Sequence, residues 1–550
     1  LNVEVKILAK VLANRLMQNI DKWVHPDQSG FMPKRSTRLN LRRLYGCLDR
    51  RDTILEPAVI LSLDAEKAFD SVGWPYLFEV LRAMGVGPKF LGWIRLLYKD
   101  LTAKVKVNGV LSREFGVRRG TRQGCPLSPI LFALAIEPLA CWLRMDAQIW
   151  GLKWDDDWED VVSLYADDIL LYLAHPSESI PRALEILSRF GEYSGLHINW
   201  DKSVAFPITP WDPPTDWESP LKWVRDGFRY LGIFVTPEPR RFLAENLEKI
   251  LDSYRREAIH WRSLPLSLMG RAVLYKMIYL PKFLYGLQNA WFEVPDSFFR
   301  AVDTVTRNLI WDGGAPRIAL ATLCRGQWDG GIAFPDLKLY YWATQLLIIN
   351  EWAFSVQQEP AVKSDRKAMA PLGYEAFLYR SKESKSLRPL TTRVVQIWQK
   401  ANKRTGWAGK VTLETPLWVT DLLPDVGLLE VRHRWDRIGI SKVGDVWEDG
   451  AIIPFEDLQA QYQLARGQRI HYMQLRHALR KYETLLLEVE EESPLEYRVL
   501  GAPIQSHAIA QIYKTLFANS RSQLEKLKEK WEEDLGRFED GSWDEACKYP

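Results

Sequence analysis

Two adjacent aspartates, Asp167 and Asp168, lie in the middle of an apolar stretch, SLYADDILLYL. A buried carboxylate without a partner is costly, and two neighbouring carboxylates repel each other, which raises a pKa unless a cation lies between them. Mg²⁺ would remove this conflict, because it prefers oxygen ligands and takes one or two carboxylates together with substrate phosphates. The pair therefore indicates either a metal site for phosphoryl transfer or, taken alone, an ordinary hairpin turn.

A third carboxylate, Asp64, follows the apolar run AVILSL, which predicts a buried strand from Ala58 to Leu63. If Asp64 lies beside the pair at the end of its strand, the three acids complete a site for two ions. In such a site one ion activates the attacking hydroxyl, and the other stabilises the leaving oxygens of a phosphoryl transfer.

Hydrophobic patterning and turn residues predict the elements that position these acids. Residues 161–174, VVSLYADDILLYLA, predict a hairpin with the aspartates at or beside its turn. Residues 196–206, LHINWDKSVAF, predict a short strand pair with Lys202 near its bend, and residues 228–235, FRYLGIFV, predict a strand. Asn108-Gly109 between alternating apolar residues predicts a further hairpin.

The rest of the chain is predicted to be mainly helical. An amphipathic helix opens it, and the basic Gly-rich loop RRGTRQGCPLSP leads into an apolar helix with Ser128 as its N-cap, which we expect Pro138 to kink or end. Helical patterning runs from about residue 240 to 310, a Trp-rich segment follows to residue 346, and the remainder is mostly helical. We expect breaks near Pro237, near Pro316 and in the polar stretch 381–393.

Composition restricts the partners. The chain has 550 residues, 47% of them hydrophobic, and a formal net charge of only +3, so a polyanion must be held by local patches. One run of cations is such a patch or, more commonly, a solvated face; it contains Lys34, Arg35, Arg38, Arg42, Arg43, Arg50 and Arg51. Five scattered cysteines without a CxxC pair indicate reduced thiols, and we expect no apolar run of the ~18 residues that a membrane span needs.

Five motifs stand in order along residues 1 to 235: LDAEKAFD, RRGTRQGCPLSP, YADD, INWDKS and YLGI. This series resembles the reverse transcriptase domain of non-LTR retrotransposons, the long interspersed elements. The later segments WRSLPLSLMGRAVLYKMIYLPKFLYGL and WDGGIAFPDLKLYYWATQL look like those that follow the polymerase in the same elements. The resemblance implies an RNA-directed DNA polymerase that transfers nucleotides from dNTPs to a primer 3′-OH by two-metal chemistry.

The implied fold class is α+β, a right-hand polymerase. Fingers and a palm with an antiparallel sheet would occupy residues 1–236, and a helical thumb-like region residues 237–315. A Trp-rich connection would follow at residues 316–380, and a mostly helical C-terminal region at residues 381–550.

The resemblance also implies roles at the acidic site. Asp64, Asp167 and Asp168, with the carbonyl of Ala65, would bind two Mg²⁺ ions, with Mn²⁺ as the alternative metal. Lys202 would protonate the departing pyrophosphate, although a surface lysine fits the same position.

Five residues match the dNTP site of the family: Arg35, Ala68, Phe69, Gln123 and Gly124. Arg35 would contact the triphosphate, and the ring of Phe69 would clash with a 2′-OH and so favour deoxynucleotides. Gln123 and Gly124 would lie under the nascent base pair, where a missing Cβ permits close approach. These residues also fit an exposed cation, a core phenylalanine and a turn.

Tyr230, Leu231 and Gly232 resemble the grip on the primer terminus, and otherwise fit a core strand. The implied partners are an RNA template, a DNA primer or target, and dNTPs, with no membrane. Residence in the nucleus and cytoplasm follows from this function alone, and the oligomeric state, the host and the target site are open.

Complete elements carry an upstream endonuclease, and many end in a Cys/His knuckle. This chain starts inside the opening motif and has only Cys547 near its end, so we expect a copy truncated at both ends or an incomplete gene model, and its activity is open. One rival is a catalytically inactive RNA-binding remnant or co-opted scaffold with the same fold. Another is a group II intron maturase or viral RNA polymerase, against which Phe69 and YADD argue. The acidic runs at 155–160 and 488–494 fit solvated loops.

Overall fold

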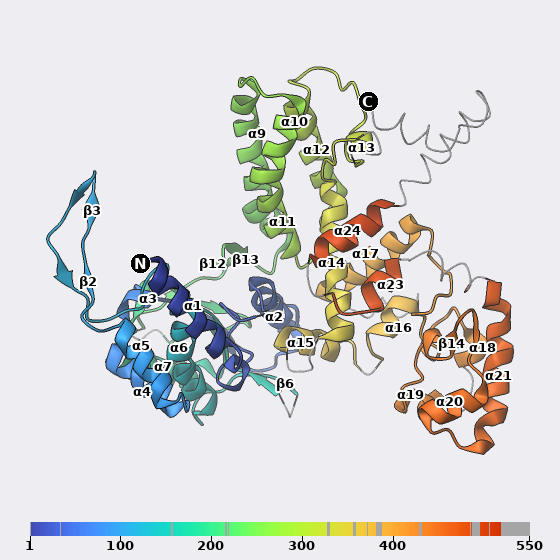
Figure 1. Cartoon of the computed structure of the whole chain (residues 1–550), viewed down its shortest axis with the longest axis horizontal. Helices are drawn as coiled ribbons and strands as arrows, with labels where there is room; N and C mark the ends of the chain where they lie inside the picture. Colours follow the sequence, from blue (N-terminus) through green and yellow to red (C-terminus); the bar gives the residue numbers. More distant parts are fainter. Residues whose placement is uncertain are drawn as a thin grey trace. The chain divides into compact units, whose positions relative to one another are not determined.

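The chain divides into two compact units in the computed structural model shown in Figure 1. One unit comprises residues 1–238 with the short segment 358–361, and the other comprises the rest. The structure describes residues 2–33, 35–155, 158–214, 217, 219–326, 331–355, 359–370, 372–380, 388–427, 432–484, 486, 495–504 and 507–518. Lys34, the acidic run at 488–494, Cys547 and most of the polar stretch 381–393 lie outside the described residues.

A five-stranded sheet with the order β11-β10-β1-β9-β8 forms the centre of the first unit. Its middle strand β1 (Ala58–Ala65) pairs antiparallel with β9 (Asp168–Ala174) on one side and β10 (Ile198–Pro207) on the other. β8 (Val162–Tyr165) is antiparallel to β9, and the short β11 (Lys222–Trp223) runs parallel to β10. The sheet is thus dominated by antiparallel pairs, as the α+β prediction requires.

Helices and short hairpins complete this unit. They are α1 (Val3–Met17), α2 (Thr37–Asp49), α3 (Ala68–Ser71), α4 (Trp74–Ala83), α5 (Pro88–Leu97), β2 (Thr102–Ala103), β3 (Lys106–Val107), β4 (Val110–Leu111), β5 (Phe115–Gly116), α6 (Ser128–Met145), β6 (Leu152–Asp155), β7 (Trp158–Asp160), α7 (Pro176–Ser194), β12 (Phe228–Tyr230) and β13 (Ile233–Val235). In Figure 1 the hairpin that carries β2 and β3 projects away from α4 to α7.

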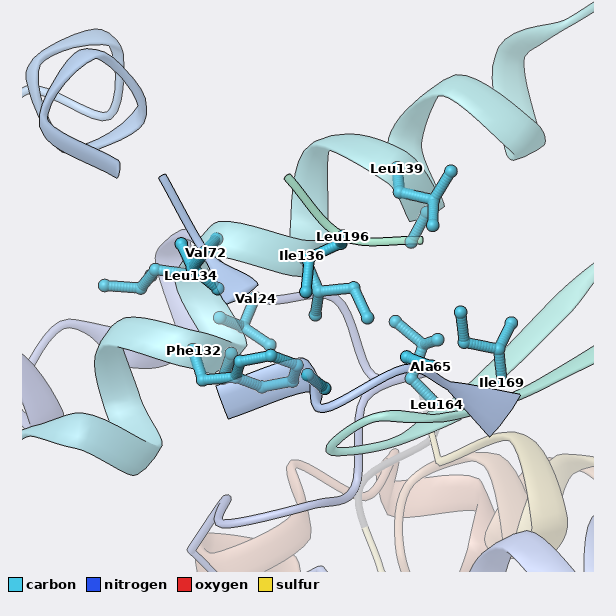
Figure 2. Close-up of a cluster of buried hydrophobic side chains, with 14 of the residues drawn as sticks. Val24, Ala65, Val72, Phe132, Leu134, Ile136, Leu139, Leu164, Ile169 and Leu196 are labelled. Atoms are coloured by element: carbon cyan, nitrogen blue, oxygen red, sulfur yellow. The ribbon is translucent and has the colours of Figure 1, made fainter. Parts of the chain in front are cut away.

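One hydrophobic core supports the ends of the acid-bearing strands. Figure 2 shows Phe132, Ile136 and Leu139 of α6 in the same cluster as Ala65 at the end of β1. The cluster also contains Leu164 and Ile169, which pair with each other across β8 and β9. Because buried side chains interdigitate closely, this packing fixes where the three strand ends lie.

The length and apolar composition of α6 test the prediction that the chain has no segment able to span a membrane. Among the described residues it is the one helix whose length and composition would allow it to cross a membrane. The expectation that no apolar segment reaches that length is therefore wrong. Two thirds of the helix (67%) is buried, and its apolar side chains pack in the core of the first unit.

Three local predictions are wrong. α6 has Leu127, not Ser128, at its N-cap position. The helix does not end at Pro138, because burial along most of its length outweighs the lost hydrogen bond, and a kink there stays a prediction. Residues 198–207 form one strand with an irregularity, not a strand pair. Residues 228–235 form a hairpin, not a strand, because Leu231 and Gly232 both adopt positive φ, 48° and 77°, as a tight two-residue turn requires.

The second unit is mostly helical, as predicted. Its helices begin with α8 (Pro239–Leu243), α9 (Lys249–Arg262), α10 (Leu268–Leu274), α11 (Leu280–Gln288), α12 (Asp296–Ile310), α13 (Leu320–Leu323), α14 (Leu337–Phe354), α15 (Pro360–Ala368), α16 (Tyr374–Tyr379) and α17 (Pro389–Thr405). They continue with α18 (Pro424–Gly427), α19 (Arg432–Arg437), α20 (Phe455–Tyr462), α21 (Arg469–Leu479), α23 (Leu495–Leu500) and α24 (Ala508–Ala518). β14 (Trp447–Glu448) and β15 (Ala451–Ile452) form a hairpin within a separate small core spanning residues 411–486.

Candidate active site

Three carboxylates converge at one end of the central sheet. Asp64 and Asp168 face each other in the ladder between β1 and β9. Asp167 is the second residue of the two-residue turn, Ala166-Asp167, that joins β8 to β9. The structure therefore brings together the three acids that the sequence placed at strand ends.

Burial and, after it, mutual repulsion disfavour the charged forms of Asp167 and Asp168. Burial, and then the neighbouring charges of Asp167 and Asp64, raise the pKa of Asp168 to about 6. Burial and then Asp64 also raise the pKa of Asp167, although its own backbone N–H opposes this. Carboxylates that share a site in this way are stabilised by a bound cation.

The donor set fits magnesium. No three His, Cys, Asp or Glu side chains in the described part of the chain form a ready-made metal cluster. Mg²⁺ does not require one, because it retains waters and completes its octahedron with substrate phosphates around one or two carboxylates. Asp64, Asp167 and Asp168 provide only hard oxygen donors, on adjacent strand ends.

A β-bulge brings Lys202 to this edge of the sheet. Ser62 of β1 pairs with Val204, whereas Asp64 pairs with Asn199, so β10 carries extra residues between these points. The Asp64 N–H donates to the Ser203 hydroxyl across 3.2 Å. Lys202 Nζ lies 3.6 Å from Asp64 Oδ2, which places the predicted proton donor beside the acids.

Phe69 lies next to the loop predicted to hold the nascent base pair. Its ring stacks on Phe132, with centroids 4.4 Å apart, and meets Phe31 edge-on at 5.9 Å. Its carbonyl accepts hydrogen bonds from the Thr121 N–H (2.5 Å) and the Thr121 hydroxyl (3.1 Å). These bonds attach the loop that carries Gln123 to α3, whose first residue is the buried Ala68.

Two glycines of this loop have different structural roles, and the approach of Gly124 to a nascent base pair stays a prediction. Gly124 has a φ of 73°, and a Cβ there would meet no atom within 4 Å, so its backbone conformation requires the glycine. A close approach within the protein occurs at Gly120, where a Cβ would lie 2.7 Å from the Asp70 backbone. A cleft of about 460 Å³ opens beside the loop, and Arg119, Arg122 and Gln123 are among its lining residues.

Arg35 makes contacts within its own loop. Its guanidinium donates to the carbonyls of Gln28 (2.6 Å) and His25 (2.8 Å) and pairs with Asp21 at 3.2 Å. Only 11% of the side chain is exposed. A triphosphate contact stays a prediction, and it would require Arg35 to exchange some of these bonds.

The basic run around Arg35 is solvated only in part, because two of its cations are buried. Arg42 and Arg43 are 4% exposed, and Arg43 pairs with Asp27 at 2.7 Å and with Asp160 at 2.6 Å. Asp160 is fully buried and also accepts from the Trp154 indole N–H, so the predicted solvated loop at 155–160 is wrong within its described residues. β6 and β7 instead form a hairpin whose last acid is an internal ion-pair partner.

Tyr230 connects the predicted primer grip to the strand before the acids. Its hydroxyl accepts a hydrogen bond from the Asn40 amide across 3.2 Å, and the same amide donates to the Leu164 carbonyl at 3.0 Å. Leu231 has a φ of 48°, an uncommon conformation for a bulky residue. Gly232 follows it in the turn of the hairpin.

Sequence reasoning missed Gln28, which contacts the turn of the acids. Gln28 is fully buried, and its side-chain oxygen accepts the Ala166 N–H at 3.0 Å. The sequence carries one signal of this contact, the glycine two residues later. A Cβ on Gly30 would lie 2.2 Å from the Ala166 nitrogen.

Comparisons with known proteins agree with this geometry. Residues 1–235 match the family of reverse transcriptases, RNA-dependent DNA polymerases. Residues 1–235 are a reverse transcriptase domain of the non-LTR retrotransposon type. The chain is 33% identical over 294 residues to the transposon TX1 149 kDa protein of Xenopus laevis, with 52% of the chain and 22% of that protein covered.

Pol polyproteins of R2 retrotransposable elements are further relatives of the reverse transcriptase domain. One from Popillia japonica is 28% identical over 351 residues, covering 60% of the chain and 47% of the polyprotein. The Pol polyprotein of the R2DM element from Drosophila melanogaster is 26% identical over 385 residues, covering 66% of the chain and 34% of that polyprotein. The chain thus spans less than half the length of each of these relatives. The predicted family is confirmed, and the relatives are transposon proteins rather than intron maturases or viral polymerases.

Among solved structures, telomerase from Candida albicans in complex with a telomeric RNA fragment is similar over 65% of this chain and 58% of that chain. The identity is 15% and the TM-score 0.32, which is too low to support further inference. The assignment of the fold therefore depends on the family match and on the sheet order of the reverse transcriptase domain.

Proposed function

We propose that this chain catalyses RNA-directed DNA synthesis, copying an RNA template by adding dNTP units to a primer 3′-OH. The observation that carries the proposal is the pairing of Asp64 with Asp168 across β1 and β9, with Asp167 in the adjoining turn. The 3′-oxygen forms a bond to the α-phosphorus, the bond to the bridging oxygen breaks, and pyrophosphate leaves.

Asp64, Asp167 and the carbonyl of Ala65 hold two divalent ions in this proposal, and Asp168 completes the cluster. Bound Mg²⁺, or Mn²⁺ in its place, lowers the pKa of the 3′-OH and neutralises charge on the leaving phosphates. Lys202 has its ammonium 3.6 Å from Asp64 and is 68% exposed, so it can reach the leaving group and donate a proton to it.

The incoming nucleotide lies over α3 and the loop attached to it. The Phe69 ring, held by its stack on Phe132, excludes a 2′-OH. Ala68 begins the same helix, and Gln123 lines the open cleft. Gln123 and Gly124 lie under the nascent base pair in this proposal. Arg35 contributes to triphosphate binding if the nucleotide displaces its contacts within the loop.

The hairpin of Tyr230, Leu231 and Gly232 positions the primer end, and an RNA template, a DNA primer and dNTPs are the partners. The helices of residues 237–315 act as the thumb, residues 316–380 as a connection and residues 381–550 as a helical C-terminal region. Copying RNA onto a chromosomal primer places the protein in the nucleus as well as the cytoplasm.

The test is extension of a DNA primer annealed to an RNA template by the purified chain, with Mg²⁺ and with EDTA. We expect extension only with the metal, and none from Asp167→Ala, which should still bind the RNA. Asp52→Asn is the matched control, because Asp52 is 89% exposed and pairs only loosely with its neighbour Arg51. Metal-dependent extension distinguishes this proposal from a catalytically inactive RNA-binding remnant, which would bind RNA without extending the primer.

A further inference from the structure

The segment Asp27–Ser29 lies beside β8 and is joined to it by a single bridge. The Leu164 N–H donates to the Asp27 carbonyl and the Ser29 N–H donates to the Leu164 carbonyl, both across 2.9 Å. Gln28 and Leu164 are therefore partners in a parallel bridge. Because Leu164 lies two residues before Ala166, this bridge sets Gln28 beside the turn that carries Asp167.

The Gln28 side chain binds the first residue of that turn at both of its backbone groups. Its Oε1 accepts the Ala166 N–H at 3.0 Å and the Gly30 N–H at 2.8 Å, and its Nε2 donates to the Ala166 carbonyl across 3.4 Å. Gln28 is 0% exposed and Ala166 is 4% exposed, so water does not serve as the partner. One amide thus satisfies three buried backbone groups.

Ala166 needs such support because its backbone is in the left-handed region, with a φ of 56°. Glycine and asparagine adopt this conformation readily, whereas alanine brings its Cβ close to the following carbonyl. An unfavourable conformation of this kind persists only where the surrounding structure determines it. The hydrogen bonds from Gln28 hold Ala166, the first residue of the turn, in this conformation.

Gln28 is itself anchored from both sides. The carboxylate of Asp27 binds Arg43 at 2.7 Å and Arg144 at 2.9 Å, and both cations are largely buried. Burial alone would raise the pKa of Asp27, but Arg43, His25 and Arg144 lower it well below its usual value. The Arg35 guanidinium binds the Gln28 carbonyl at 2.6 Å.

We propose that Gln28 is a positioning residue for catalysis: its amide holds Ala166 in the conformation that directs the Asp167 carboxylate toward Asp64 and Asp168. This role rests on the proposed polymerase function. Metal ligands must be held within about 0.5 Å of their productive positions, and partners of ligands change metal affinity or activity by about 10- to 100-fold when removed.

The test uses two substitutions in the full chain. Gln28→Met keeps the length of the side chain and removes both hydrogen-bonding groups. Gln28→Glu keeps the acceptor for the Ala166 and Gly30 amides and removes the donor. Gln148→Met is the control, because Gln148 is exposed in the loop after α6.

We expect Gln28→Met to lower the kcat of primer extension about 10- to 100-fold and to raise the Mg²⁺ concentration for half-maximal rate about tenfold. The KM for dNTP and the affinity for RNA should change less than about twofold, because no substrate group touches Gln28 in this arrangement. Gln148→Met should match the unsubstituted chain in all four quantities. A lower kcat with an unchanged Mg²⁺ requirement would overturn the proposal, since a merely structural role reduces only the amount of active protein.

Amide hydrogen exchange tests the contact without relying on activity. Gln28→Met should accelerate exchange of the Ala166 and Gly30 amides at least about tenfold, and Gln28→Glu should restore most of their protection. If the unsubstituted chain extends no primer but these amides respond as expected, the polymerase proposal fails while the contact stands. If the amides of Gln28→Met exchange at the original rate, the positioning role of Gln28 is refuted whatever the activity.

Discussion

Two hairpins of the reverse transcriptase domain reverse direction through two residues, and they are held in opposite ways. The turn between β3 and β4 uses Asn108 and Gly109, with φ values of 48° and 86°, and it is exposed. A Cβ on Gly109 would meet no atom within 4 Å. The turn between β8 and β9 places Ala166 in the left-handed region, buried and bonded to Gln28.

The comparison shows two sources of turn geometry. Asn-Gly adopts this conformation by local preference, so the surroundings need not contribute. Alanine does not share that preference, so distant residues must impose the left-handed conformation of Ala166. A departure from local preference is expected where side chains serve function, because the turn that presents Asp167 is selected for the position of its carboxylate and not for ease of folding.

The strongest test of the difference is Gly30→Ala. Its Cβ would lie 2.2 Å from the Ala166 nitrogen, a backbone atom that cannot yield without moving the turn. We expect primer extension to fall at least about 100-fold, because displacement of a reacting group by 1 Å can cost about that much. The rate of single-nucleotide addition measures this effect. A rate within threefold of the unsubstituted chain would mean that the contact does not set the position of the acids.

Replacing Phe69 tests how the chain selects deoxynucleotides over ribonucleotides. The Phe69 ring touches Phe31, the residue after Gly30. We expect Phe69→Ala to raise the use of ribonucleotides relative to deoxynucleotides at least about tenfold, because the steric barrier to a 2′-OH is removed. The measurement is the ratio of kcat/KM for matched dNTP and rNTP. Phe78→Ala is the control, since Phe78 on α4 is also half-buried against the core. An unchanged ratio would show that Phe69 does not select against the 2′-OH of a ribonucleotide.

The partly buried Asp168 beside the β8–β9 turn predicts a dependence of stability on pH that the exposed β3–β4 turn lacks. The pKa of Asp168 is about 6 in the folded chain against an ordinary value of 3.8, so between about pH 4 and 6 the folded state holds a proton that the unfolded state has released. Without metal, stability therefore falls as pH rises through this window and is lowest above it. Because Asp168 is partly exposed, the effect is about 1–2 kcal/mol.

Asp168→Asn should remove this penalty. In EDTA at pH 7.5 we expect the substitution to stabilise β1 and β9 by about 1–2 kcal/mol, measured by amide hydrogen exchange, and to have little effect at pH 4. Mg²⁺ should stabilise these strands in the unsubstituted chain and do so less in the variant. Equal stability of the two chains at pH 7.5 would show that neither burial nor the neighbouring carboxylates penalise the charged form of Asp168.

The smallest effect is expected at the exposed turn. Gly109→Ala introduces a side chain at a φ of 86° but contacts nothing, so it should destabilise the hairpin by about 1 kcal/mol and leave primer extension within twofold. Hydrogen exchange of β3 and β4, together with the extension rate, checks both parts. A loss of activity comparable to that of Gly30→Ala would remove the contrast between the two turns.

Local patterns predicted the acids but not the residues that hold them. Alternating and continuous apolar runs identified β1 and the β8–β9 hairpin, because burial of strands leaves a direct signal in sequence. Lys202 was placed near a bend, and it lies at a bulge opposite Asp64. No comparable signal marks Gln28, since its bonds to Ala166 join residues 138 positions apart.

Charge gave the least reliable signal. Arg43 and Asp160 both occur in runs of like charge, which favours solvated segments, yet they pair with each other inside the protein. Pro138 does not end α6 for a related reason, because a core packed along most of the helix keeps it continuous where local preference favours an end. Tertiary contacts decide such cases, and sequence neighbours do not reveal them.

The most direct measurement is Mg²⁺-dependent addition of a single dNTP to a primer on RNA by the unsubstituted chain, Asp64→Asn and Asp52→Asn. If Asp64 on β1 and the turn acids share one metal site, Asp64→Asn should lower the rate at least about a thousandfold, while Asp52→Asn keeps it within twofold. A rate for Asp64→Asn above a tenth of that of the unsubstituted chain would contradict the assignment of this end of the sheet as the catalytic centre.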